Sequence, residues 1–148
     1  MKPILHHYDA SPFSRKAQKM LGIKQLAWHS VEMPMTAPKP DIEQLTGGYR
    51  GTPVLQLGGD FFVDNLAIAE ALDRVYANQL SLSGPGSRFI DDAIGHWADE
   101  LFEPVLRAAV GKFAADWDDD FRADRQAVFP HLDFDRLPGE LPNFNHRI

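Results

Sequence analysis

Two predicted helix starts and one proline carry the residues in this chain that are best suited to chemistry. Ser11 precedes Pro12, and Asp64 and Asn65 precede an apolar repeat with helical spacing. Ser, Asp and Asn are good N-caps, and Pro fits the first helical position. Each helix start offers unpaired N–H groups to an anion. Pro53 lacks a backbone donor, and the residues beside it can pair with an extended peptide.

The stretch from Tyr49 to Asp73 positions most of these residues. A short strand is predicted from Thr52 to Leu57, and Gly58-Gly59 is a two-residue turn typical of a β-hairpin. Asp60 to Val63 is the returning strand, and the capped helix follows. A hairpin before a capped helix occurs in many α/β proteins, so this unit alone does not identify a function.

The segment TPVLQLGGDFFVDN resembles the glutathione-binding half of the glutathione S-transferase family, in which a Pro-Val-Leu strand precedes an acidic and a small polar residue at a helix start. The resemblance implies that Pro53 follows a cis bond and that the backbone of Val54 pairs with the cysteinyl part of glutathione. It also implies that Asp64 and Asn65 hold the γ-glutamyl end. The family usually has Ser where this chain has Asn65.

The segment SPFSRK resembles the family variant in which the reactive residue directly precedes a proline. This implies that the Ser11 hydroxyl donates to the glutathione sulfur and, with the positive end of its helix, favours the thiolate. A free thiol has a pKa of about 8.5, so little of it is ionised at neutral pH. Ser14 and Tyr8 remain alternatives, and Ser11 could simply cap its helix.

Two basic residues are candidates for the glycyl end of the peptide. Arg50 lies just before the Thr-Pro turn, and Lys39 lies in the loop before the second predicted helix. Both assignments are implied by the resemblance. No metal site is predicted, because His6 and His7 are adjacent on a predicted strand and face opposite sides. The co-substrate implied is glutathione.

The composition excludes several classes of protein. Among 148 residues, 15 Lys and Arg against 21 Asp and Glu give a net charge of −6, which argues against nucleic acid as the main partner. No apolar run approaches the roughly 20 residues that span a bilayer, and no signal peptide is recognised, so we expect no membrane partner and a cytoplasmic location. The chain has no cysteine, so the redox chemistry of thiols in the protein itself is excluded.

The predicted order of elements is βαβαββα, which is the order of an α/β thioredoxin-like domain. We expect this domain to span residues 1–77, a Ser-, Gly- and Pro-rich linker to span 78–86, and an all-α domain to span 87–148. Its first helix follows an apolar repeat from Phe89 to Phe113, with a kink at Pro104. A second helix is predicted from Asp119 to Val128, and an irregular tail follows.

The helical domain is shorter than the one the resemblance implies, so we expect it to be incomplete and to expose apolar surface. The resemblance implies a homodimer. The predicted activity is attack of the glutathione thiolate on a small electrophile. The alternative is a non-catalytic binding or regulatory module with the same fold.

Overall fold

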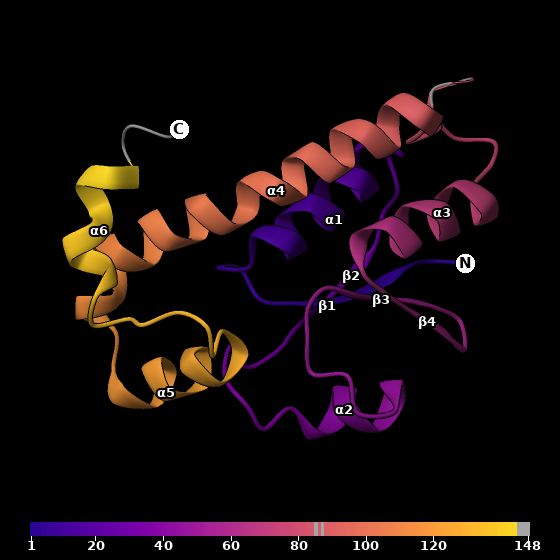
Figure 1. Ribbon diagram of the computed structural model, residues 1–148. Coiled ribbons are helices and arrows are strands. Elements are labelled where there is room, and N and C mark those ends of the chain that lie inside the picture. The colour runs from indigo at the N-terminus through magenta and orange to yellow at the C-terminus, as the bar shows by residue number, and fades with distance from the viewer. Residues whose placement is uncertain (85, 87, 145–148) are drawn as a thin grey trace. The chain divides into compact units, whose positions relative to one another are not determined.

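The structure is a computed structural model that describes residues 1–84, 86 and 88–144. The chain divides into two compact units, Met1–Pro85 and Gly86–Ile148. The first unit has the predicted order of elements (Figure 1): β1 (Ile4–His7), α1 (Pro12–Ile23), β2 (His29–Glu32), α2 (Pro40–Thr46), β3 (Val54–Leu57), β4 (Asp60–Val63) and α3 (Asn65–Val75).

The four strands form one sheet in the order β2-β1-β3-β4. β1 and β2 run parallel because α1 crosses between them, whereas β3 is antiparallel to both β1 and β4. The hairpin between β3 and β4 turns at Gly58, whose φ of 65° is one that glycine adopts without strain. This mixed sheet with helices is the thioredoxin-like arrangement that the sequence predicts.

The alternation of side chains along the strands gives the sheet two apolar faces. Leu5 and Leu55 point to one face, where they pack with Leu21 of α1 and Leu72 of α3. The neighbouring residue Val54 points to the other face. The cluster there is completed by residues of the loop after β2, of α2 and of β4, namely Met33, Ile42, Phe61 and Val63.

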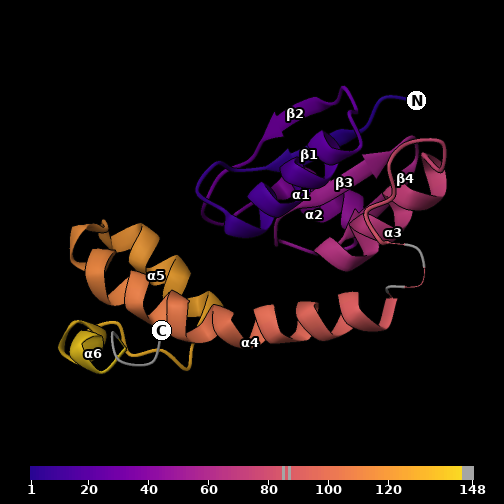
Figure 2. The same cartoon turned by 90° about the horizontal axis from the view of Figure 1, so that it is seen from above.

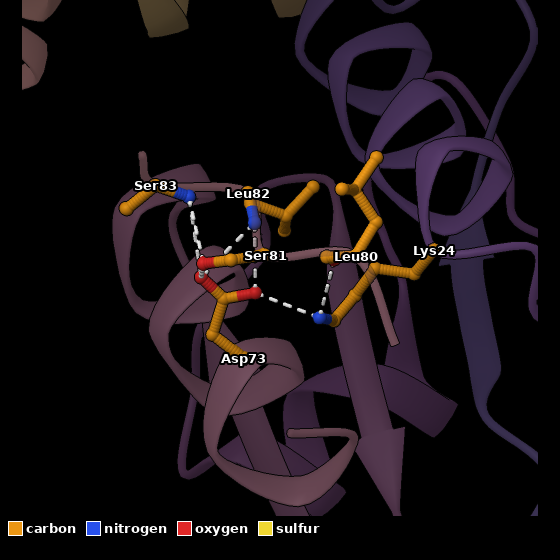
Figure 3. A network of polar contacts seen from close by, with 6 residues as sticks. All are labelled: Lys24, Asp73, Leu80, Ser81, Leu82 and Ser83. Atoms are coloured by element: carbon orange, nitrogen blue, oxygen red, sulfur yellow. Dashed lines mark hydrogen bonds and ion pairs between the residues drawn. The ribbon is translucent and has the colours of Figure 1, made fainter. Parts of the chain in front are cut away.

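An ion pair between a buried lysine and a partly exposed aspartate joins α1, α3 and the segment after α3 (Figure 3). Lys24, the C-cap of α1, is fully buried, and its Nζ donates to Asp73 Oδ1 at 2.7 Å and to the Leu80 carbonyl at 3.0 Å. The Asp73 carboxylate also accepts hydrogen bonds from the Ser81 hydroxyl and from the N–H groups of Leu82 and Ser83. Residues 80–83, which lie in the linker expected from composition, are therefore bound to the first unit.

The second unit contains α4 (Arg88–Phe113), the short 3-10 helix η1 (Ala114–Asp116), α5 (Asp119–Val128) and α6 (Leu137–Phe144). α4 continues through Pro104 as one helix, and α5 has the predicted bounds. The prediction of an irregular tail is wrong, because α6 forms within it. The tail buries three apolar residues, Leu132, Phe134 and Leu137, against Val110 and Ala114. This tertiary packing stabilises a helix that the three prolines of the tail made difficult to predict from the sequence.

We expect Asp73→Asn to lower the free energy of unfolding at about pH 7 by about 3 kcal/mol, because it leaves the buried Lys24 ammonium without a counter-charge. Burial would raise the pKa of Asp73, but hydrogen bonds from Lys24, Leu82, Ser81 and Ser83 outweigh it, and the pKa lies below its ordinary value of 3.8. The carboxylate therefore stabilises the fold above its unfolded-state pKa, and this is lost as pH falls through the folded-state pKa.

Urea unfolding of wild type and variant across pH measures this effect. The difference in the free energy of unfolding should be full near neutral pH and should shrink below about pH 4. Asp60→Asn, which changes an exposed carboxylate at the start of β4, is the matched control and should shift stability by less than about 0.5 kcal/mol. A difference for Asp73→Asn that is constant down to about pH 3 would contradict the role of the ion pair.

Candidate functional site

The register of the strands brings the candidate residues to one end of the sheet. The carboxyl ends of β1 and β2 lie together because these strands are parallel. His6 lies opposite Val54, and Val54 lies opposite Val63, so the start of β3 and the end of β4 lie at this same end. Figure 2 shows the sheet with its helices. The segments that leave or enter this end carry Tyr8, Ser11, Lys39, Arg50, Pro53, Asp64 and Asn65.

Ser11 is the N-cap of α1, as predicted. Its Oγ accepts a hydrogen bond from the Ser14 N–H at 3.1 Å and a second from the Thr52 hydroxyl at 3.2 Å. Ser11 is 2% exposed. Ser14 is fully buried, and within the described residues its hydroxyl has no hydrogen-bond partner. Ser11 is the acceptor in both of these bonds, so neither of them uses its proton, and its hydroxyl contacts Thr52 in the segment before Pro53.

The helix start at α3 differs from the prediction. Asp64 alone is the N-cap: its Oδ1 accepts from the Leu66 N–H at 2.7 Å, and its φ is 73°. Asn65 is the first residue of α3 and is buried, so the sequence-based interpretation of Asn65 as a cap is wrong. In the described part of the chain, the Asn65 Oδ1 has no hydrogen-bond partner. It is a buried acceptor to which no described residue donates.

The two basic candidates occupy different environments. Lys39 is buried at the start of α2, with its Nζ 5.0 Å from the centre of the Tyr8 ring. Its backbone N–H donates to Glu43 Oε1 at 3.1 Å, which holds the loop against the helix. Arg50 is half-buried in the segment before β3. The structure thus brings Lys39 beside Tyr8, the third candidate for activating a thiol.

The Thr52–Pro53 peptide bond is cis, as predicted, and so is Ala37–Pro38. Val54 is the first residue of β3 and is flanked by His6 of β1 and Val63 of β4. A peptide that paired with the Val54 backbone would have to displace one of these strands. Thr52 lies outside the strand pairing and directly before the cis proline.

Two residues near this site belong to no sequence motif, and their contacts were not predicted. Thr52 contacts Ser11, although 41 residues separate them. The ring of Tyr49 folds back over Gly51, where a Cβ would lie 2.4 Å from the Tyr49 hydroxyl oxygen. Burial and then the negative charge of Asp64 raise the pKa of Tyr49 above its ordinary value of 10.0. For the contact between Thr52 and Ser11, the one signal in the sequence was a hydroxyl-bearing residue directly before Pro53.

Comparison with known proteins identifies the family. Residues 5–80 match the family described as glutathione S-transferase, N-terminal domain. The chain belongs to the glutathione S-transferase family. None of the curated proteins compared matches this glutathione S-transferase chain.

Solved structures of the family resemble both units. A glutathione S-transferase-like protein from Pseudomonas syringae is 35% identical, with a TM-score of 0.65, over 88% of this chain and 46% of that chain. A glutathione S-transferase of Ceriporiopsis subvermispora in complex with glutathione is 18% identical, with a TM-score of 0.64, over 88% and 62%. A glutathione transferase from Phanerochaete chrysosporium is 16% identical, with a TM-score of 0.68, over 99% and 71%. The last two likenesses concern the fold alone.

The chain spans 46% and 62% of the length of the first two of these proteins. The predicted fold class, a thioredoxin-like unit followed by a helical unit, is confirmed. In the described ranges, no helix is both long and apolar enough to cross a membrane. The same residues include no group of three or more His, Cys, Asp or Glu side chains that could hold a metal ion.

Because Asp64 has a positive φ, we expect Ala and Gly substitutions at this position to lower the free energy of unfolding by different amounts. Asp64→Ala loses the cap and keeps the Cβ at positive φ that the wild type also has, so it should cost about 1 kcal/mol of unfolding free energy. Asp64→Gly loses the same cap but removes the Cβ, so it should cost less than about 1 kcal/mol. Urea unfolding of the three proteins measures both.

Asp118 provides the matched control, because it caps α5 through the Phe121 N–H with an ordinary φ of −68°. The gap between its Ala and Gly variants should be smaller than the gap at Asp64. Equal gaps at the two positions would show that the positive φ of Asp64 carries no cost.

Proposed function

We propose that this chain binds glutathione at the end of the sheet where β3 begins, and that the bound thiolate attacks a small electrophile. The observation that carries the proposal is the hydrogen bond between Thr52 and Ser11. It joins the hydroxyl at the start of α1 to the segment beside the cis bond of Pro53. If the backbone of a thiol-bearing peptide lies along that segment, its sulfur would reach the Ser11 hydroxyl. The glutathione complex of the Ceriporiopsis relative agrees with this proposal.

The ends of the peptide meet residues of opposite charge in this proposal. Asp64 and the Asn65 Oδ1, which has no partner among the residues that the structure describes, accept from the γ-glutamyl ammonium group, and the N–H groups at the start of α3 face its carboxylate. Lys39 and Arg50 bind the glycyl carboxylate through their positive charges. We move the proposed contact with the cysteinyl backbone from Val54 to Thr52, because Val54 already belongs to the sheet on both sides.

In this proposal, Ser11 only has to favour the ionised form of the bound thiol. A hydroxyl that donates to sulfur stabilises the thiolate and not the thiol, so it lowers the pKa of the bound thiol. The positive end of α1 acts in the same direction. A pKa lowered from about 8.5 by one or two units raises the ionised fraction at neutral pH about tenfold or more. The thiolate sulfur then donates an electron pair to the electrophilic carbon, and the bond from that carbon to its leaving group breaks, so that the leaving group departs as an anion with the bonding pair.

The second candidate function is a binding or regulatory module without turnover. The burial of Ser11 favours it, since an electrophile must reach a sulfur held against a nearly covered hydroxyl. Calorimetric titration with glutathione, followed by a conjugation assay, separates the two candidates. Binding together with turnover supports the transferase, and binding alone supports the module. Absence of binding would contradict both.

We expect Ser11→Ala to lower the conjugation rate near neutral pH about tenfold while weakening glutathione binding less than about threefold. The reason is that the hydroxyl stabilises the thiolate, whereas most of the affinity comes from the charged ends of the peptide. The pH–rate profile should move upward toward about 8.5. The variant also loses the helix cap, so rates are compared well below both melting temperatures.

Ser14→Ala is the matched control, since it removes a fully buried hydroxyl of the same helix that has no hydrogen-bond partner in the described residues. It should leave the profile unchanged. A Ser11→Ala enzyme with the wild-type profile would transfer the role to Tyr8 or to the helix end alone.

We also propose that the chain forms a homodimer through α4. Ile90, Ile94, Trp97, Leu101 and Val105 lie at helical spacing and are all exposed. An apolar stripe of this length in water usually marks an interface. Light scattering should give twice the mass of 16.6 kDa for the wild type. Trp97→Asp should weaken association at least about tenfold, because it puts a charge into the apolar contact.

Asp92→Lys changes an exposed charge of α4 away from that stripe and is the control, which should leave the mass unchanged. A wild-type mass of one chain at high protein concentration would refute the homodimer.

A further inference from the structure

The Thr52 side chain is hydrogen-bonded to Ser11, the residue proposed to activate the thiol. Its hydroxyl lies 3.2 Å from the Ser11 Oγ and donates to it. The residue is half-buried and directly precedes the cis Pro53, so its backbone and side chain are both held by the same turn. The contact joins the segment before β3 to Ser11, the N-cap of α1.

The hydrogen-bonding capacity of a hydroxyl makes this contact directional. The Ser11 Oγ has one proton to donate and two lone pairs that accept. The backbone N–H of Ser14 can only donate, and it occupies one lone pair at 3.1 Å. When Thr52 donates to the other lone pair, Ser11 has no acceptor among these two neighbours. Its proton is then left for a third group.

Ser11 itself has little contact with solvent that could replace the Thr52 hydroxyl. Ser11 is 2% exposed, and the Ser14 side chain on the same turn of α1 is fully buried. Without the Thr52 hydroxyl, the second lone pair of Ser11 would lack a donor in a place that solvent barely reaches. A chain of donors that ends on a charged acceptor is also strengthened along its length, because each bond polarises the next.

We propose that Thr52 is a positioning residue, whose hydroxyl donates to Ser11 and so directs the Ser11 proton toward a bound thiol. The inference rests on the proposed function, because it requires that Ser11 face a sulfur. The order of donors is Thr52 Oγ1–H to Ser11 Oγ, then Ser11 Oγ–H to the thiolate. No bond other than hydrogen bonds forms or breaks, and Thr52 does not touch the peptide thiol.

The experiment measures the pKa of enzyme-bound glutathione from the ultraviolet absorbance of its thiolate across pH, at saturating glutathione. Thr52→Val keeps the shape of the side chain and removes the hydroxyl. We expect this pKa to rise by roughly half a unit to one unit, and kcat near neutral pH to fall about threefold to tenfold. The KM for glutathione should change less than about twofold, because the contacts of the peptide ends are intact.

Thr52→Ser retains the hydroxyl and should restore the wild-type pKa of the bound thiol. In the Ser11→Ala background, Thr52→Val should produce no further rise, since Thr52 acts only through Ser11. Thr46→Val is the matched control: its hydroxyl donates to the carbonyls of Ile42 and Tyr49 and does not reach Ser11. That variant should leave the pKa of the bound thiol unchanged. Thr52→Ala is the second test variant if valine does not fit the turn.

The outcomes separate this inference from the function on which it rests. A wild-type protein that binds no glutathione overturns both. A Ser11→Ala variant with an unchanged thiol pKa overturns the role of Thr52 and transfers the activation of the thiol to Tyr8 or to the helix end, while the proposed function stands. A pKa that rises in Ser11→Ala but not in Thr52→Val overturns the role of Thr52 alone. A pKa that falls in Thr52→Val also overturns it, because Ser11 would then have been donating to Thr52.

Discussion

The constraint on which the first unit depends is the central, antiparallel position of β3. Because β3 opposes both β1 and β4, its first residue lies beside the last residues of its neighbours. Chain segments that are 40 residues or more apart in the sequence therefore meet, as the contact between Ser11 and Thr52 demonstrates. The strand itself is fully engaged with its neighbours, so ligand recognition falls to the residues just outside it.

Local patterns predicted most of the first unit. The cap at Ser11, the Gly58-Gly59 turn and the apolar spacing of α3 are local signals, and each appears where it was expected. The contact between Thr52 and Ser11 could not be predicted in this way, because it follows from strand register rather than from neighbouring residues. The same holds for the Tyr49 ring over Gly51 and for the ion pair of Lys24, whose partner comes from another helix.

The errors of the sequence analysis also have physical causes. Asn and Asp both cap helices, so residue type does not distinguish the members of the pair Asp64-Asn65, and the backbone at Asp64 corrects the interpretation of Asn65 as a cap. In the tail, proline weakens the helical signal, but burial of Leu137 against α4 outweighs it. The Asn65 Oδ1 is buried and has no hydrogen-bond partner among the described residues, and a buried acceptor that lacks a donor costs free energy.

The ion pair of Lys24 and Asp73 also has a consequence for any attempt to isolate the first unit. The compositional boundary ends the domain at residue 77, but four partners of this pair come from residues 80–83. A fragment cut at 77 would keep both charges and lose the carbonyl, hydroxyl and amide groups that enclose them. Water would enter around an ammonium group that the intact fold keeps dry. A recombinant fragment of this unit should therefore extend to residue 84, into a segment whose composition alone suggests a dispensable tether.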